Sequence, residues 1–214
     1  MTDNKTTIDN IIFDMDGTLW DSSENVAKSW NEAVRGLADR RFTAEDIQSV
    51  MGLPMDKIAE RFFPEAAEET RLKILERCCE GENAYLRAHG GEIYPDTAPV
   101  LGELSKSCRL FIVSNCQAGY IEAFLDYYGL WKYITDRLCW GDNGLQKSEN
   151  IRLIMQRNNA ENALYVGDTQ GDCDSAYAAG ARFAFAAYGF GDADRCDIKL
   201  NRLSELAEKL KNLC

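Results

Sequence analysis

The feature that most constrains this chain is the alternation of short apolar segments with longer amphipathic ones over most of its length. The short segments are rich in Ile, Leu, Val and Phe, which is typical of buried strands. We expect five such strands, at residues 8–13, 109–113, 134–140, 163–166 and 182–186. Strands that alternate with helices pair in parallel through right-handed crossovers. The sequence therefore predicts an α/β fold, with a doubly wound parallel sheet of the Rossmann-like kind.

A region of different character interrupts this alternation after the first strand. Residues 22–89 contain segments with helical spacing and no strand pattern. The helical segments are expected at residues 26–37, 44–51, 55–62 and 65–86. A chain of 214 residues can hold one α/β domain with a modest insertion. We predict a core of residues 1–20 and 93–214, with an all-helical cap inserted at residues 21–92.

Composition excludes some classes of partner. The net charge of −11 disfavours nucleic acid and anionic membranes, which both require a cationic surface. Residues 1–10 show no secretory leader, and no stretch approaches the roughly eighteen apolar residues of a membrane helix. The eight cysteines form no CxxC pair and accompany a single histidine, so we expect reduced thiols in a cytoplasmic protein and no zinc site.

Polar residues follow the predicted strands at positions where a site would form. In doubly wound sheets, ligands bind beyond the carboxyl ends of the strands, where residues distant in sequence converge. Six polar residues stand at or near these ends: Asp14, Asp16, Ser114, Asn115, Asp168 and Asp172. The sequence therefore predicts one polar site at this edge of the sheet.

The residue types at this edge indicate phosphoryl chemistry. Four carboxylates would repel one another unless a cation were bound, and oxygen ligands suit Mg²⁺, which commonly shares its coordination with a substrate phosphate. A carboxylate can also attack phosphorus and form an aspartyl phosphate. Lys147 supplies positive charge at the start of a predicted helix, and Ser114 and the amide of Asn115 can donate hydrogen bonds to the phosphate. Asp16 is placed to act as a general acid and base.

Four motifs in this order resemble those of the haloacid dehalogenase superfamily. They are DMDGT at residues 14–18, the Ser114-Asn115 pair, Lys147, and GDTQGD at residues 167–172. The resemblance covers roughly residues 8–206 and is nearest to the phosphoglycolate phosphatase-like and β-phosphoglucomutase-like group, whose members carry a helical cap between the first two motifs. Segments 20–21 and 93–95 would be the hinges of that cap.

The resemblance implies a role for each motif residue. Asp14 would be the nucleophile, and Asp16 the general acid and base whose backbone carbonyl also coordinates magnesium. Asp168 would bind the metal directly, with Asp172 close behind it. Ser114 and Lys147 would bind the phosphate. Dehalogenase members lack the second aspartate of the first motif, so Asp16 favours phosphate chemistry.

The resemblance implies a Mg²⁺-dependent phosphatase acting on a small phosphorylated metabolite, with 2-phosphoglycolate as the leading single candidate. A phosphosugar mutase is the first alternative, but mutase members carry an arginine shortly after a cap glycine. Here Gly52 is followed by Leu53, Pro54 and Met55. A non-catalytic binding or regulatory protein is the second alternative, and the intact motif residues argue against it.

Overall fold

The core of the protein is a six-stranded parallel sheet. The computed structural model describes residues 8–213, so the predicted core limits at residues 1 and 214, and most of the segment considered for a leader, lie outside it. The strands follow the order β5-β4-β1-β6-β7-β8, with every neighbouring pair parallel. Their bounds are β1 Asn10–Phe13, β4 Arg109–Ser114, β5 Asp136–Cys139, β6 Ala163–Gly167, β7 Arg182–Ala186 and β8 Ile198–Leu200. The predicted α/β fold is confirmed.

All five predicted strands are present, with ends that differ from the prediction by at most two residues. The sixth strand, β8, was not predicted. It has three residues, of which Ile198 and Leu200 are buried while Lys199 is exposed. One apolar–polar–apolar triplet is too short to stand out as a strand in the sequence, because strand patterns become distinctive only over four or more residues.

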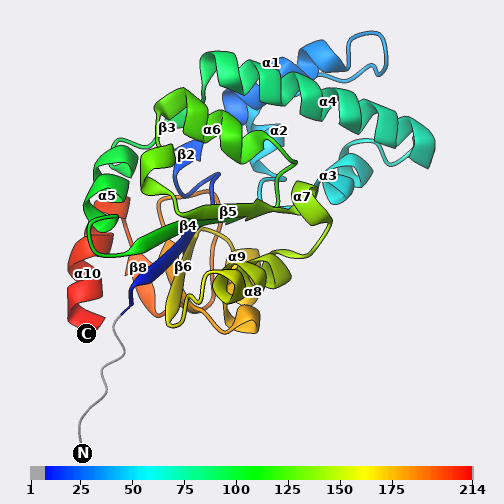
Figure 1. Cartoon of the computed structure of the whole chain (residues 1–214). Helices are drawn as coiled ribbons and strands as arrows, with labels where there is room; N and C mark the ends of the chain where they lie inside the picture. Colours follow the sequence, from blue (N-terminus) through cyan, green and yellow to red (C-terminus); the bar gives the residue numbers. More distant parts are fainter. Residues whose placement is uncertain (1–7, 214) are drawn as a thin grey trace, which may run out of the picture.

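Successive residues of each strand face opposite sides of the sheet, and helices cover both sides (Figure 1). On one side, Ile12 of β1 packs with α8 (Lys147–Arg157) and α9 (Gln170–Ala179). On the other side, Ile11 and Phe13 pack with three helices. These are α5 (Thr97–Leu104), α6 (Tyr120–Tyr128) and α10 (Leu206–Leu213). Strands buried on both faces read as continuous apolar runs, which explains the sequence pattern.

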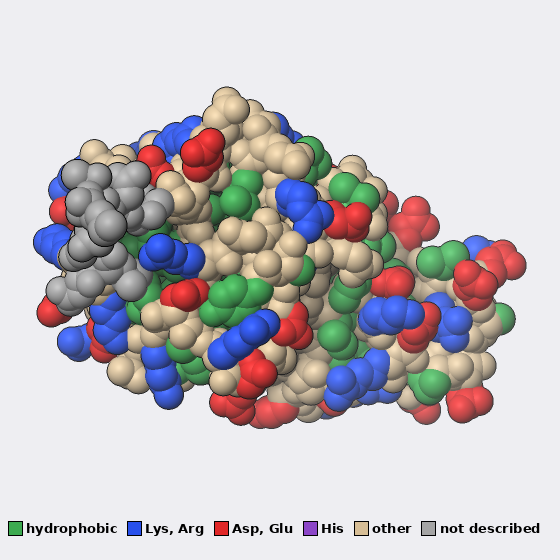
Figure 2. Space-filling model, turned by 90° about the horizontal axis from the view of Figure 1, so that it is seen from below, with side chains coloured by type: hydrophobic (Ala, Val, Ile, Leu, Met, Phe, Trp, Pro, Cys, Tyr) green, Lys and Arg blue, Asp and Glu red, His purple; other side chains and the backbone are tan. Residues whose placement is uncertain are grey.

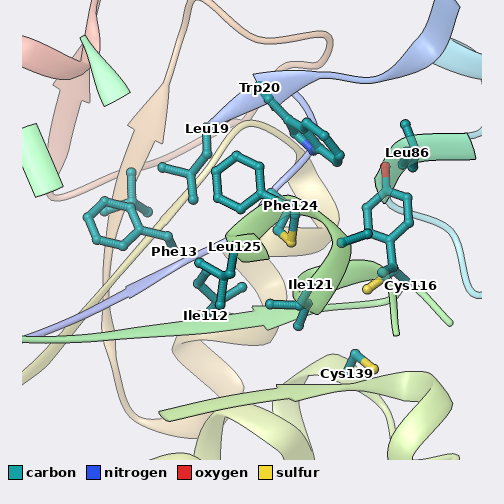
Figure 3. Close-up of a cluster of buried hydrophobic side chains, with 14 of the residues drawn as sticks. Phe13, Leu19, Trp20, Leu86, Ile112, Cys116, Ile121, Phe124, Leu125 and Cys139 are labelled. Carbon is teal, nitrogen blue, oxygen red and sulfur yellow. The ribbon is translucent and has the colours of Figure 1, made fainter. Parts of the chain in front are cut away.

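The apolar face of α6 forms the centre of the second cluster (Figure 3). Phe124 lies with its ring centroid 4.9 Å from that of Trp20, and both side chains are fully buried. Phe13 of β1 and Ile112 of β4 belong to the same cluster. Burying one such side chain contributes about 2 kcal/mol. Because Trp20 directly precedes the helical insert, this packing anchors the insert to the sheet.

The helical insert lies above the carboxyl edge of the sheet (Figure 1). It is joined to the core through the short antiparallel pair β2 (Trp20–Asp21) and β3 (Glu92–Ile93), so the two predicted hinge segments lie side by side. Its interior includes edge-to-face contacts of Trp30, Phe42 and Phe62. The helices are α1 Ser23–Ala33, α2 Ala44–Gln48, α3 Met55–Phe62 and α4 Glu68–His89. The predicted helical insertion is confirmed.

Three short elements complete the fold: α7 (Trp140–Asn143) and the 3₁₀ turns Trp131–Tyr133 and Leu203–Glu205.

On the face seen in Figure 2, basic and acidic side chains are interspersed rather than gathered into one basic surface. Within residues 8–213, none of the helices combines the length and apolar character needed to cross a membrane.

Gly141 in α7 allows two loops at the carboxyl edge to meet. Its N–H donates to the carbonyl oxygen of Cys116 over 3.0 Å. A Cβ at this position would lie 2.0 Å from the backbone nitrogen of Ala118 and 2.5 Å from the backbone carbon of Gln117. These are backbone atoms, which cannot rotate away as a side chain can. Only glycine therefore permits this approach of the loop after β5 to the loop after β4.

Replacing Gly141 by alanine tests this close approach. We expect Gly141→Ala to lower the free energy of unfolding by about 2 kcal/mol or more, because the overlap forces the backbone to shift. The matched control is Gly81→Ala in α4, where a Cβ meets only Ala33 Cβ at 3.9 Å. That change should stabilise the protein by up to about 1 kcal/mol. Urea unfolding of both variants measures the difference, and an equal response would show that the two loops are not in contact.

Candidate active site

Five of the seven predicted site residues are buried at the carboxyl edge of the sheet. The three central strands β4, β1 and β6 are neighbours, so the loops that follow them converge. All five side chains are buried, with at most 6% of each residue exposed. They are Asp14 after β1, Ser114 at the end of β4, Lys147 at the start of α8, Asp168 after β6 and Asp172 in the first turn of α9.

Lys147 holds two of the acids. Its Nζ lies 3.0 Å from Asp14 Oδ1 and 2.6 Å from Asp172 Oδ1. Burial alone would lower the pKa of Lys147, but the neighbouring carboxylates, Asp14 first and then Asp172, outweigh it and raise the pKa above its ordinary value. The lysine therefore remains protonated and fixes Asp14 in one orientation.

Both carboxylate oxygens of Asp172 accept hydrogen bonds. Its Oδ1 accepts from Lys147, and its Oδ2 accepts from the backbone N–H groups of Asp168 and Thr169 at 3.1 and 3.0 Å. Thr169 is the N-cap of α9, and its side chain accepts from the Asp172 N–H in a capping box. A carboxylate in the first turn of a helix is favourable because the exposed N–H groups carry partial positive charge. Asp172 thus positions Lys147 and closes the start of α9.

Asp168 has one carboxylate oxygen that accepts no hydrogen bond from the described residues. Its Oδ2 accepts from the backbone N–H of Phe190 at 2.8 Å, whereas its Oδ1 is buried and has no hydrogen-bond partner within residues 8–213. Gly17, at φ +79°, packs so closely that a Cβ there would lie 2.2 Å from Asp168 Oδ2. Both the positive φ and the close approach require glycine, which explains the glycine of the first motif. An unpartnered buried carboxylate oxygen is costly unless a ligand completes it.

The three acids Asp14, Asp168 and Asp172 form a cluster that fits a divalent cation. One carboxylate oxygen from each lies within 4.8 Å of the others. Burial, followed by the Asp172 and Asp14 charges, raises the pKa of Asp168 to about 8. Burial also raises the pKa of Asp14 to about 6, although Lys147 opposes the shift. Three buried acids around one lysine leave negative charge uncompensated, and hard oxygen ligands of this kind suit Mg²⁺.

Asp16 belongs to a different environment from Asp14, although only Met15 separates them. Its Oδ1 accepts from the hydroxyl of Ser22 at 2.7 Å, and Tyr120 OH lies 2.8 Å from Oδ1 and 2.9 Å from Oδ2. Burial raises the pKa of Asp16 to about 7, while the bonds from Ser22 and then Tyr120 moderate the shift. A carboxyl with a pKa near neutrality can both give and take a proton. Its carboxylate lies outside the three-acid cluster, and coordination through its backbone carbonyl stays a prediction.

Asn115, the last of the seven predicted site residues, connects the core to the insert. Its side-chain Nδ2 donates to the carbonyl oxygen of Gly52, in the loop between α2 and α3, over 2.9 Å. Its Oδ1 is buried and has no hydrogen-bond partner in the part of the chain that the structure describes. Ser114 lies beside it and lines the cavity described next. The predicted pair therefore lies at the edge of the site, with the Asn115 side chain turned toward the insert.

A small cavity of about 50 Å³ lies between the helical insert and the carboxyl edge of the sheet. Its floor includes Asp16 and Ser114, and its roof is mainly apolar, with Val26, Val50 and Ile58 among its members. A mostly apolar cavity with a few polar groups at one end is the usual form of a small-molecule site. Asp16 and Ser114 place this cavity next to the predicted catalytic residues.

Sequence reasoning missed several residues of the site. The sequence indicated no role in the site for Ser22, for Tyr120 or for the loop at Phe190. Hydrogen bonds to Asp16 span 104 positions for Tyr120, and such a distance leaves no local pattern. Two more residues that line the cavity were missed for the same reason: Glu82 of α4 and Gln117 of the loop after β4.

Comparison with known proteins identifies the family. The model of the family described as haloacid dehalogenase-like hydrolase matches residues 11–186. The chain belongs to this family. That match includes all the predicted site residues, and the prediction of a haloacid dehalogenase-like protein is confirmed. In this hydrolase the matched segment runs from β1 to the end of β7, so it contains the helical insert as well as the site.

Curated relatives of the hydrolase are similar over nearly their whole length. A phosphoglycolate phosphatase of Vibrio parahaemolyticus is 27% identical, over 92% of this chain and 94% of the relative. One from Aquifex aeolicus is 25% identical, over 94% and 96% respectively. The structure also resembles that of a predicted phosphoglycolate phosphatase from Haemophilus somnus, with a TM-score of 0.84, 19% identity and coverage of 95% and 98%. The last likeness concerns the fold alone.

Removing the buried lysine tests the charge balance of the site. We expect Lys147→Met to lower the free energy of unfolding by about 3 kcal/mol or more, because Asp14 and Asp172 are then left as buried carboxylates without a cation. Urea unfolding at about pH 8 without divalent cations measures this change. The control Lys106→Met removes an exposed ion pair with Glu103 and should change stability by less than about 1 kcal/mol. Similar losses in both variants would contradict the buried pairing.

Proposed function

We propose that this protein is a Mg²⁺-dependent phosphatase that hydrolyses a small phosphomonoester through an aspartyl phosphate on Asp14. The observation that carries the proposal is the contrast between two neighbouring acids. Asp14 is held by Lys147 beside the partnerless oxygen of Asp168, as a nucleophile next to a cation site should be. Asp16 is held apart from them, with its pKa raised to about 7, as a proton donor and acceptor should be.

The reaction proceeds in two steps of phosphoryl transfer. In the first, Asp14 attacks phosphorus while the bond to the ester oxygen breaks, and Asp16 gives that oxygen its proton. In the second, Asp16 takes a proton from water, the resulting hydroxide attacks phosphorus, and phosphate leaves while Asp14 returns to its carboxylate form. Lys147 and Ser114 bind the phosphate oxygens. Catalysis of this kind depends mainly on positioning and on compensation of charge.

The metal site follows from the acids already described. Asp14 and Asp168 would hold Mg²⁺ together with the backbone carbonyl of Asp16, and Asp172 would support them from behind. When bound, the ion supplies positive charge that offsets the phosphate oxygens and the acids around them. The unused Oδ1 of Asp168 supports this assignment.

The helical insert, residues 21–92, acts in this proposal as a cap over a core of residues 1–20 and 93–214. Its cavity faces Asp16 and Ser114, so an ester bound there is shielded from bulk water. The names of the curated relatives support a phosphatase and do not favour the mutase alternative. They also make 2-phosphoglycolate the first compound to assay.

The nucleophile and the metal are tested together by phosphate release from a panel of small phosphomonoesters. We expect release with Mg²⁺, loss of release in excess chelator, and recovery when Mg²⁺ is restored. Asp14→Asn should reduce turnover to background, because an amide is not a nucleophile toward phosphorus. The variant should still show a cooperative thermal unfolding transition, which would confirm that it is folded.

The control for that experiment is Asp56→Asn, an exposed acid on α3, which should keep full activity. Turnover by Asp14→Asn, or full activity in excess chelator, would overturn the proposed mechanism.

Asp16→Asn separates proton transfer from nucleophilic attack. We expect the first turnover of an alkyl phosphate to slow by about 10²-fold or more, because its alkoxide needs a proton to leave. With p-nitrophenyl phosphate, whose phenolate leaves unaided, a rapid burst of about one equivalent of nitrophenolate should remain before the second step limits the rate. Stopped-flow absorbance measures this burst. Equal slowing of the first turnover with both esters would remove Asp16 from the acid role.

A further inference from the structure

The roof of the cavity contains one buried acid that the proposed mechanism does not use. Glu82 of α4 is 4% exposed and lines the same cavity as Asp16 and Ser114. Its Oε1 accepts from Gln117 Nε2 at 2.9 Å, and its Oε2 accepts from the indole N–H of Trp30. Both partners are neutral, and no ion pair of Glu82 is found among the described residues. A buried carboxylate whose only partners are neutral donors destabilises the fold. Its presence in a cavity therefore indicates a role in binding.

The rest of the cavity offers no positive charge. Among its described lining residues none is Lys, Arg or His, and the two charged ones are Asp16 and Glu82. In the loop after α2, Gly52 and Leu53 are followed by no basic residue until Lys57, which is exposed and paired with Glu60 at 3.0 Å. Lys147 is already paired with Asp14 and Asp172 at the phosphate end. The space beyond the phosphate is therefore negative and has a low dielectric constant, where like charges repel strongly.

From this arrangement we infer that Glu82 selects the alcohol part of the substrate, favouring an apolar group that carries an amine or hydroxyl and excluding one that carries a second anionic group. The inference rests on the proposed phosphatase and narrows its substrate class. A carboxylate on the leaving group would face Glu82 and Asp16 with no cation to receive it. An ammonium or hydroxyl group would instead donate to the remaining lone pairs of Glu82.

Gln117 and Trp30 act as positioning residues for Glu82. Gln117 comes from the core loop after β4, and its Nε2 also lies 3.2 Å from Asn83 Oδ1 on α4. The contact therefore joins the core to the helix that crosses above α6 (Figure 1). Trp30 comes from α1, so donors from two other elements fix both oxygens of the carboxylate. Burial raises the pKa of Glu82 to about 7, with the bonds from Gln117 and Trp30 opposing the shift.

Three esters that differ only at the far end of a two-carbon alcohol test the inference. They are 2-aminoethyl phosphate, 2-hydroxyethyl phosphate and 2-phosphoglycolate, assayed with Mg²⁺ at about pH 8, where Glu82 is mostly ionised. We expect kcat/KM for the amine and hydroxyl esters to exceed that for 2-phosphoglycolate by about tenfold or more, as for gain or loss of one charge-assisted hydrogen bond. Glu82→Gln keeps the shape of the side chain, and it should reduce the preference for the amine over the carboxylate by a similar factor.

The matched control is Glu80→Gln, which removes the same charge from an exposed position on the same helix and should leave the ratios unchanged. If the role of Glu82 is purely structural, Glu82→Gln should change kcat/KM by the same factor for all three esters. That result, or a wild-type preference for 2-phosphoglycolate, would overturn the inference and leave the phosphatase standing.

Calorimetric binding of the same three esters to the Asp14→Asn protein separates the two proposals, because it needs no turnover. One outcome is that the wild-type protein hydrolyses none of the esters while the variant binds the amine or hydroxyl ester more tightly than the carboxylate ester. In that case the selection by Glu82 holds and the proposed phosphatase activity is overturned. If none is hydrolysed and none binds, both are overturned.

Discussion

The structure of the site depends on the burial of one lysine between two carboxylates. Lys147, which is 4% exposed, bridges Asp14 and Asp172, and these ion pairs join the end of β1 to the starts of α8 and α9. A buried charge survives only when it is paired and hydrogen-bonded, so each partner constrains the other. Asp172 fulfils that condition through the N-terminus of α9, and Asp14 fulfils it through Lys147. One oxygen of the remaining acid, Asp168, has no hydrogen-bond partner among the described residues, and the three acids around one lysine form a cluster that fits a cation.

The second constraint is the connection between the helical insert and the sheet. Trp20 packs on Phe124 of α6, directly before Asp21 pairs with Glu92 across the two crossing segments. Tyr120 on the same helix, α6, reaches Asp16 together with Ser22 at the start of the insert. The packing that anchors the insert thus also fixes the position of the acid predicted to move protons. A change in the angle of the insert would alter the hydrogen bond from Ser22 to Asp16, because Ser22 directly follows the crossing segment β2.

Much of the fold could be predicted because the sheet is buried on both faces. Continuous apolar runs such as the one around Ile12 are distinctive, and each ended close to its predicted boundary. The strand β8 was missed because it is short and lies at the edge of the sheet, where Lys199 faces solvent. The motif residues at the carboxyl edge were also predictable, since parallel strands must bring their ends together. Their roles in catalysis and metal binding are proposals that the geometry supports.

The sequence by itself determined the fold class, the family and the set of acids around Lys147, because these are written in apolar periodicity and in short motifs beside strand ends. Only the tertiary structure decided which groups surround each acid. It placed Ser22 and Tyr120 on Asp16, left one oxygen of Asp168 without a hydrogen-bond partner among the described residues, and brought Glu82 into the lining of the cavity. These contacts join residues up to 104 positions apart. No local sequence pattern encodes such contacts, because they arise when helices that are far apart in the sequence pack together.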